Sequence, residues 1–286
     1  MQKQFLFTGL LLGILLIACQ KQELLQPVTS QNPVFNAKDP NTSGTPSTNG
    51  LGSLSYGDTI FYLSATGTNI ISPVNFTGFG KGEFKGFPGG LEIDSLTGAI
   101  NISESETGLR YKVMFLPFKS KDTIITKIVL SGINFYDHIF HFSKGDTVAN
   151  SIYNASGIAF VPGQFGVGTG CSFDDGGGCK AQGVIISNFD GSINLAQTLR
   201  AGAIPQLNNS VGEFLYNYKM DDKSGLATNH LKVKIYFYQT EHDIPSYLWD
   251  ILLKERQGVI IPALASSGFR AKTQTARPPC LIIVMN

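Results

Sequence analysis

Residues 90–101, Gly-Leu-Glu-Ile-Asp-Ser-Leu-Thr-Gly-Ala-Ile-Asn, are echoed 93 positions later by residues 183–194, Gly-Val-Ile-Ile-Ser-Asn-Phe-Asp-Gly-Ser-Ile-Asn. In the first copy we expect Ile93 to point into a core, the next five residues to reverse the chain, and Ile100 to return to that core. Gly98 supplies the positive φ that such a turn needs. Because the glycine, isoleucine and asparagine positions coincide, the sequence predicts two copies of one strand-turn-strand module.

Shorter echoes accompany this repeat in a β-rich chain. Gly57–Ile60 is matched by Gly145–Val148, and Gly108–Val113 has a looser match in Gly212–Tyr218. Over 232–238, apolar residues alternate with lysines and tyrosines, which is typical of a half-buried antiparallel strand. Because no stretch before Asp243 shows a convincing helical period, we predict an all-β fold.

The first copy carries a more specific resemblance. The pattern Pro88-x-Gly90-Leu91-x-Ile93-x-x-x-Thr97-Gly98-x-Ile100, followed by Gly108 and Tyr111-x-Val113, resembles the immunoglobulin-like, cadherin-like modules that are common in bacterial surface proteins. It covers about residues 53–118, and the second copy, about 131–240, matches less well and carries insertions. The resemblance implies two tandem immunoglobulin-like β-sandwiches that serve as a spacer, adhesin arm or accessory module. It implies no shared catalytic residue.

The N-terminus predicts export and lipid attachment. Lys3 is followed by an apolar run, Phe5–Ala18, which is too short to span a membrane and has the length of a signal-peptide core. Leu16-Ile17-Ala18-Cys19 resembles the bacterial lipobox, which implies that Cys19 is diacylated. Two acyl chains anchor a protein stably in a membrane. Gln20–Glu23 is similar to the signal that sends Bacteroidetes-type lipoproteins to the outer face of the outer membrane.

These observations predict an outer-membrane lipoprotein that is exposed on the cell surface and organised in five parts. They are a signal peptide (1–18), a flexible tether rich in Asn, Ser, Thr, Pro and Gly (19–52), a first module (53–120), a second module with insertions (121–242), and a short C-terminal helix with a tail (243–286). The helix is expected to begin at Asp243-Ile244-Pro245 and to pack its tryptophan, Trp249, against the sandwich. The apolar end, Cys280–Met285, is expected to add an edge strand.

Composition argues against a nucleic-acid partner. The chain has 22 basic and 21 acidic residues, and the signal peptide contains Lys3 but no acid, so the mature chain has 21 of each. Nucleic-acid binding depends largely on a basic surface that releases counterions. This charge balance does not supply one.

One loop gathers the candidate site residues. Cys171 and Cys179 flank Ser-Phe-Asp-Asp-Gly-Gly-Gly, and in an oxidising compartment we expect them to form a disulfide, with Cys280 as the odd thiol. Their spacing lacks the further ligands of a zinc site. Asp174 and Asp175 in this loop, with Asp190 nearby in sequence, are candidate calcium ligands, but no calcium-loop pattern is present, and a solvated glycine-rich loop is the favoured interpretation. We expect no other cofactor.

Catalytic motifs are absent from the sequence. It contains no G-x-S-x-G, H-E-x-x-H or S-x-x-K pattern. The sequence therefore predicts a non-catalytic surface lipoprotein, used for binding, adhesion or structure, whose ligand is a glycan or a protein. Two alternatives remain: a glycan-active enzyme using carboxylates of the Asp174–Asp190 region as acid and base, and an accessory subunit of an envelope or polysaccharide-handling complex.

Overall fold

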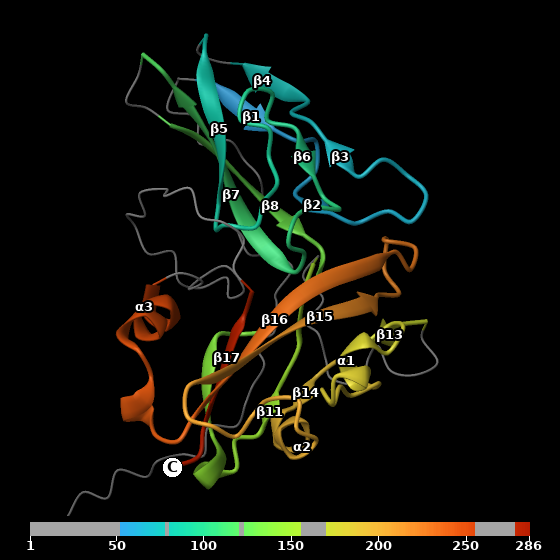
Figure 1. Ribbon diagram of the computed structural model, residues 1–286. Coiled ribbons are helices and arrows are strands. Elements are labelled where there is room, and N and C mark those ends of the chain that lie inside the picture. Colours follow the sequence, from blue (N-terminus) through green and yellow to red (C-terminus); the bar gives the residue numbers. More distant parts are fainter. Residues whose placement is uncertain (1–51, 78–79, 120–122, 156–169, 255–277) are drawn as a thin grey trace, which may run out of the picture. The chain divides into compact units, whose positions relative to one another are not determined.

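The computed structural model describes residues 52–77, 80–119, 123–155, 170–254 and 278–286, all of which belong to the compact unit Pro33–Asn286. These residues form short β-strands in several sheets with few helices, which confirms the all-β class (Figure 1). The signal peptide, Cys19 and the tether up to residue 51 lie outside the described residues.

The strands fall into two sets along the chain, followed by one C-terminal strand. The first set is β1 (Ser53–Ser55), β2 (Ile60–Phe61), β3 (Ile70–Ile71), β4 (Asn75–Thr77), β5 (Gly82–Phe87), β6 (Ile100–Asn101), β7 (Leu109–Pro117) and β8 (Ile124–Leu130). The second set is β9 (Gly132–Asn134), β10 (His138–His141), β11 (Val148–Ala149), β12 (Ile152–Asn154), β13 (Ser172–Phe173), β14 (Ile193–Asn194), β15 (Ser210–Lys219) and β16 (Thr228–Tyr238). The last strand is β17 (Cys280–Val284).

The two sets are paired in the same order. In the first set β1 pairs with β4, β3 with β6, and β7 with both β5 and β8. In the second set β9 pairs with β12, β11 with β14, and β15 with both β13 and β16. All of these pairs are antiparallel. The sets differ at one place: β2 pairs directly and in parallel with β8, whereas β17 lies between β10 and β16 and is parallel to both (Figure 1).

The repeated segment folds alike in both copies, as predicted. An antiparallel bridge joins Ile93 to Ile100 and its counterpart joins Ile186 to Ile193, again 93 positions on. Backbone hydrogen bonds also recur in pairs: Asp94 N to Ala99 O and Ser187 N to Ser192 O, both 2.8 Å; Gly98 N to Asp94 O and Gly191 N to Ser187 O, both 2.9 Å; Asn101 N to Glu92 O and Asn194 N to Ile185 O, both 2.9 Å.

Each turn is pressed against its core through a glycine. Gly98 has φ +75° and a Cβ added there would lie 2.8 Å from the Phe84 ring, while Gly191 has φ +72° and its added Cβ would lie 2.6 Å from the Phe173 ring. A tyrosine hydroxyl also donates to the carbonyl of each glycine, from Tyr56 in the first copy (2.6 Å) and from Tyr216 in the second (3.2 Å). Both the backbone angle and the space therefore require glycine.

Three groups of buried apolar side chains hold these strands. The first is formed by residues 54–130 of the first set together with Ala227, and the second by residues 133–285, including most of the second set. The third lies under the helix α3 (Ser246–Lys254) and contains Cys280, Ile282 and Val284 of β17. Because Leu281 and Ile283 belong to the second group, β17 contributes to two groups at once, one on each face.

The structure corrects three expectations about organisation. The predicted boundary between residues 120 and 121 separates β7 from β8, which pair along their lengths, so β8 belongs with the first set. The C-terminal strand lies inside its sheet instead of at the edge, because β17 has β10 on one side and β16 on the other. The match between Gly57–Ile60 and Gly145–Val148 does not correspond to a structural repeat. Ile60 lies in β2, which pairs with β8, whereas Val148 lies in β11, which pairs with β14.

Helices account for the remaining differences. Two short helices, α1 (Gly178–Ala181) and α2 (Leu195–Arg200), precede residue 243 and were not expected. They are too short to show a periodic pattern, and α2 begins because the Asn194 side chain accepts a hydrogen bond from Gln197 N. The expected C-terminal helix is present as α3, preceded by a 3₁₀ turn, Glu241–Asp243. Trp249 is half-buried and packs on the third apolar group, as predicted.

The tight packing of the repeated turn can be tested with a matched pair of substitutions. Gly98 and Gly145 have nearly equal φ, +75° and +79°, but a Cβ added at Gly145 would meet no atom within 4 Å. We expect Gly145→Ala to lower the free energy of unfolding by about 1 kcal/mol through backbone strain alone, and Gly98→Ala by about 2–4 kcal/mol because the Phe84 ring must also move. Guanidinium unfolding measures both. Equal losses would contradict the packing described for this turn.

Candidate functional site

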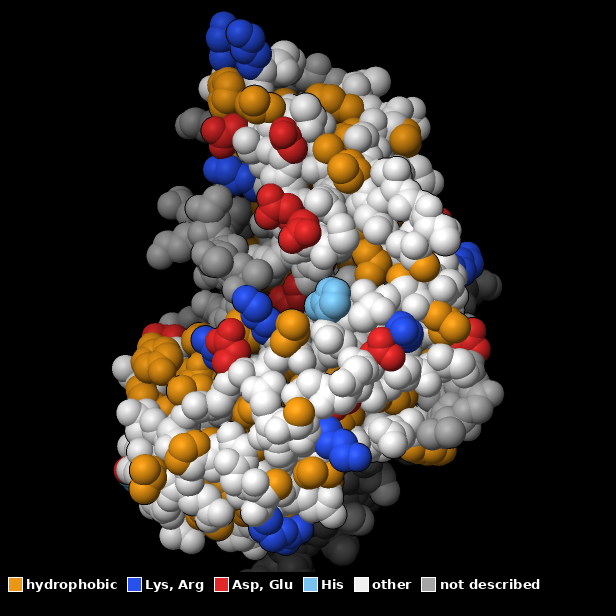
Figure 2. Space-filling model, turned by 45° about the vertical axis from the view of Figure 1, so that its right-hand side comes forward, with side chains coloured by type: hydrophobic (Ala, Val, Ile, Leu, Met, Phe, Trp, Pro, Cys, Tyr) orange, Lys and Arg blue, Asp and Glu red, His pale blue; other side chains and the backbone are white. Residues whose placement is uncertain are grey.

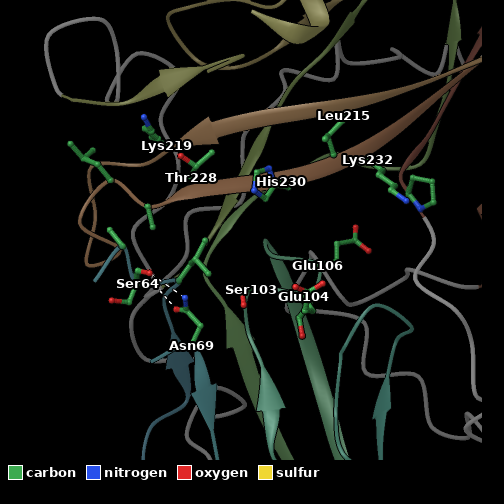
Figure 3. Close-up of a pocket in the computed structure, with 16 residues that line it drawn as sticks. Ser64, Asn69, Ser103, Glu104, Glu106, Leu215, Lys219, Thr228, His230 and Lys232 are labelled. Atoms are coloured by element: carbon green, nitrogen blue, oxygen red, sulfur yellow. Dashed lines mark hydrogen bonds between the residues drawn. The ribbon is translucent and has the colours of Figure 1, made fainter. Parts of the chain in front are cut away.

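A groove of about 930 Å³ opens between the loop that follows the first repeat and the hairpin β15–β16 (Figure 3). Its lining comes from both strand sets and is mostly polar. The residues are Leu63, Ser64, Ala65, Asn69, Ser103, Glu104, Ser105, Glu106, Leu215, Lys219, Leu226, Ala227, Thr228, His230, Lys232 and Pro278. Concave sites with several convergent polar groups are the usual places for ligand binding.

The first wall is built directly on the repeated segment. Ser105 Oγ donates to the carbonyl of Asn101 (2.6 Å), the last residue of the repeat, and accepts from Glu92 N (2.9 Å). Glu106 N donates to the carbonyl of Gly90 (2.7 Å), where the repeat begins. The loop that presents Glu104 and Glu106 is therefore held at both ends of the turn.

The second wall is one face of the β15–β16 ladder. Along this face Leu215 lies opposite Lys232, Asn217 opposite His230, and Lys219 opposite Thr228. Asn217 Oδ1 lies 2.7 Å from His230 Nδ1. Since an amide oxygen only accepts, Nδ1 carries the proton and Nε2 is the acceptor when the ring is neutral. The alternating strand pattern thus presents two cations and a histidine in a row.

A buried tyrosine hydroxyl ties the two strand sets together, and a second cluster of hydroxyl groups lies around Asp222. Tyr218 is fully buried, and its hydroxyl bonds to Thr107 Oγ1 (2.8 Å), Ile133 N (3.0 Å) and Ile133 O (3.3 Å). Asp222 Oδ2 accepts from the Tyr153 hydroxyl (2.7 Å) and from Ser131 Oγ (3.0 Å). Burial raises the pKa of both tyrosines, so they stay neutral donors at physiological pH. The bond between Tyr218 and Thr107 joins the second set to the first.

Opposite charges face one another across the groove. Glu104 and Glu106 stand on the first wall, and Lys219, His230 and Lys232 on the second (Figure 3). In the space-filling view a histidine and lysines lie close to acidic side chains, and neither sign of charge dominates this face (Figure 2). None of the 16 lining residues carries an aromatic ring other than the His230 imidazole. The groove is therefore suited to a polar ligand that carries charge.

The expected disulfide is not formed. Cys179 is buried at the start of α1, and its thiol donates to the Leu215 carbonyl (3.4 Å). Cys171 Sγ instead accepts from Asp221 N (3.2 Å) at the other end of the loop. The cause is local. The Asp174 carboxylate accepts hydrogen bonds from the backbone N–H groups of Cys179 and Lys180 and so stabilises a helical turn that the sequence pattern did not indicate.

The three aspartates proposed for calcium serve separate local purposes. Asp174 caps α1, Asp175 forms an ion pair with Lys219 (2.9 Å), and Asp190 accepts from Ser192 N (3.0 Å) and Ser192 Oγ (2.7 Å). Within the described ranges, no three His, Cys, Asp or Glu side chains come together as a metal site. Asp175 is nevertheless connected to the groove, because its ion-pair partner Lys219 is a lining residue.

The groove residues were missed by sequence reasoning for a simple reason. Lys232, His230 and Lys219 occupy the outward positions of alternating strands, where charged residues are ordinary. The alternation itself indicates a shared face, but no local pattern indicates that the loop 103–106 lies opposite to it. Two other histidines also have local partners, since His138 pairs with Asp146 and His141 with Glu241.

Comparisons with known proteins add little to this picture. No family model matches the chain, and no curated protein matches it. Among solved structures it is similar to the crystal structure of Drosophila N-cadherin EC1-4, with 11% identity and a TM-score of 0.20. The match covers 65% of this chain and 49% of that one, so it spans about half of the cadherin chain. No helix within the described ranges has the length and hydropathy needed to cross a membrane.

Thiol reactivity tests the placement of the cysteines. Burial, and then the neighbouring Asp174, raise the pKa of Cys179 to about 12, so at pH 8 roughly one thiol in 10⁴ is ionised. We expect iodoacetamide to modify half-buried Cys171 at least tenfold faster than Cys179 in the folded protein, and both at similar rates in guanidinium, as measured by peptide mass spectrometry. Finding a Cys171–Cys179 disulfide in the protein isolated without reductant would contradict this placement.

Proposed function

We propose that this chain is a non-catalytic, lipid-anchored lipoprotein of the outer cell surface, built from two tandem immunoglobulin-like modules, and that its groove binds an exposed segment of a partner protein. The observation that carries the proposal is the groove of about 930 Å³, with Glu104 and Glu106 facing Lys219, His230 and Lys232. The lipobox resemblance at Cys19 supports the anchor, and the composition of residues 19–52 supports a tether between that anchor and the groove.

The architecture of the proposal is supported by the two strand sets. The strands of the two sets form the same three antiparallel arrangements in the same chain order. Each set also contains the same strand-turn-strand, and the two copies lie 93 positions apart. A tandem repeat of one module explains why the groove has two walls of different origin: the first module gives the loop 103–106 and the second gives the hairpin face. Ligand binding at a junction between modules is common, because two surfaces meet there at an angle.

The charges favour a protein segment as the ligand. Charge complementarity gives specificity and fast association, and it requires a partner that carries both signs. A polypeptide segment with acidic and basic side chains satisfies both walls, with a carboxylate toward Lys232, a hydrogen-bond donor toward His230 Nε2 and its cations toward Glu104 and Glu106. A neutral glycan offers neither charge.

The geometry offers less to a glycan-active enzyme. Its candidate acid and base shape their own loops: both oxygens of Asp174 accept backbone N–H groups, and Oδ1 of Asp190 accepts from Ser192 N and Ser192 Oγ. The ion pair with Lys219 lowers the pKa of Asp175, whereas a general acid at neutral pH needs a raised pKa. An accessory subunit of an envelope complex would use the same groove, and location distinguishes it from a surface protein.

One set of cell lines tests the anchor and the groove together. Cells would express the wild type, Cys19→Ala, Lys232→Glu or the control Lys127→Glu, whose side chain is exposed on β8 outside the groove. We expect wild type and both lysine variants to be membrane-bound and removable by protease from intact cells, and Cys19→Ala to be lost from the membrane fraction. Immobilised matrix proteins and a glycan array then serve as ligand probes.

Binding separates the outcomes. We expect a charged protein of the panel to bind the wild type and Lys127→Glu equally. It should bind Lys232→Glu at least about tenfold more weakly, because the new glutamate repels the carboxylates of the bound protein segment. Unchanged binding by Lys232→Glu, or binding confined to neutral glycans, would contradict the groove proposal. A membrane-bound chain that protease cannot reach on intact cells would instead favour the accessory subunit.

A further inference from the structure

The second strand set contains a slot that the first set lacks. In the first set β2 and β8 are direct parallel neighbours, with Ile60 opposite Val129. The corresponding strands β10 and β16 are kept apart by β17, which pairs with β10 on one side and with β16 on the other. The slot between β10 and β16 is thus an interruption of a repeated architecture, filled by the last strand of the chain.

Burial and hydrogen bonding make the slot specific for its occupant. All five residues of β17 are at most 1% exposed, with Leu281 and Ile283 in the second apolar group and the other three in the third. The ends are fixed as well: Cys280 N donates to Asp137 Oδ1 (2.7 Å), and Asn286 N donates to the Gln239 carbonyl (3.2 Å). A shift of one residue would exchange the two faces and break both end hydrogen bonds, so these contacts favour a single register.

Chain connectivity does not define that register. Because β17 is parallel to both neighbours, no hairpin turn joins it to either of them. Along the sequence, 25 residues (255–279) separate it from the end of α3. A strand of the same sequence from another molecule would therefore make the same contacts, which is the condition for exchange of an element between identical chains.

We propose that the slot between β10 and β16 is an interaction site for residues 280–284 of a second copy of this chain, so that two molecules exchange their C-terminal strands. The edge position of β10 provides the opening, because in its described sheet β10 has β17 as its sole strand neighbour. Exchange competes with self-insertion and is governed by concentration: a tethered strand has an effective concentration in the millimolar range. This inference is independent of the proposed function.

A pair of thiols placed on different molecules tests the exchange. Lys234 on β16 is the direct partner of Cys280 on β17, and neighbouring strands are about 4.8 Å apart, within the roughly 4.4–6.8 Å that a disulfide spans. The acceptor chain would carry Lys234→Cys and Cys280→Ala. The donor chain would keep Lys234 and its native Cys280. With Cys171→Ser in both, a 234–280 disulfide between them requires the donor strand to occupy the acceptor slot.

The experiment uses full-length chains of two sizes, one carrying a tag. They are mixed at about 1 mM, warmed to the start of unfolding, cooled under oxidising conditions, and analysed by non-reducing electrophoresis and peptide mapping. A single chain with Lys234→Cys and native Cys280 serves as the intrachain control. An acceptor with Lys127→Cys, exposed on β8, in place of Lys234→Cys controls for random collision. Melting curves of every variant show that each one folds.

We expect the mixed 234–280 disulfide in tens of per cent of the chains at about 1 mM, and at least about tenfold less at 10 μM, as tethering at millimolar effective concentration requires. The Lys127→Cys control should give none. The proposal is overturned if the intrachain disulfide closes while mixed dimers do not exceed that control. It is also overturned if folded variants give neither product, because β17 then does not lie beside β16.

Discussion

The parallel insertion of β17 between β10 and β16 is the constraint on which the second half of the molecule depends. Its five residues are buried on both faces and join the apolar group of the second strand set to the group beneath α3. Fully burying an aliphatic side chain contributes about 1.5–3 kcal/mol, so together these residues contribute as much as the roughly 5–15 kcal/mol net stability of a typical domain. The last residues of the chain are therefore part of the core.

The candidate site depends in turn on the repeat. One copy of the turn positions the loop that carries Glu104 and Glu106, and the other half supplies the strand face with His230 and Lys232. The buried hydroxyl of Tyr218, in the second half, holds the two halves together through its hydrogen bond to Thr107 of the first half. Neither half alone forms the groove, which explains why the site is a property of the pair and why each half contributes charges of one sign.

Local signals were sufficient to predict the turns and the β class, because glycine at a positive φ and isoleucines at fixed spacing determine a strand-turn-strand on their own. The position of β17 could not be predicted, because a short apolar run looks the same at an edge and between two strands, and its partners are distant in sequence. The groove was missed because its residues are ordinary outward-facing polar side chains. The Cys171–Cys179 disulfide was wrong because Asp174 directs the loop into a helical turn.

Amide hydrogen exchange of the full-length protein tests the central claim most directly. If β17 completes the sheet, the amides of Leu281–Val284 exchange only through global opening of the second half, with the same free energy as those of Leu231–Phe237 on β16. Exchange of Leu281–Val284 within seconds, while β16 and β8 remain protected, would contradict the account, because β17 would then be a dispensable tail and not part of the core.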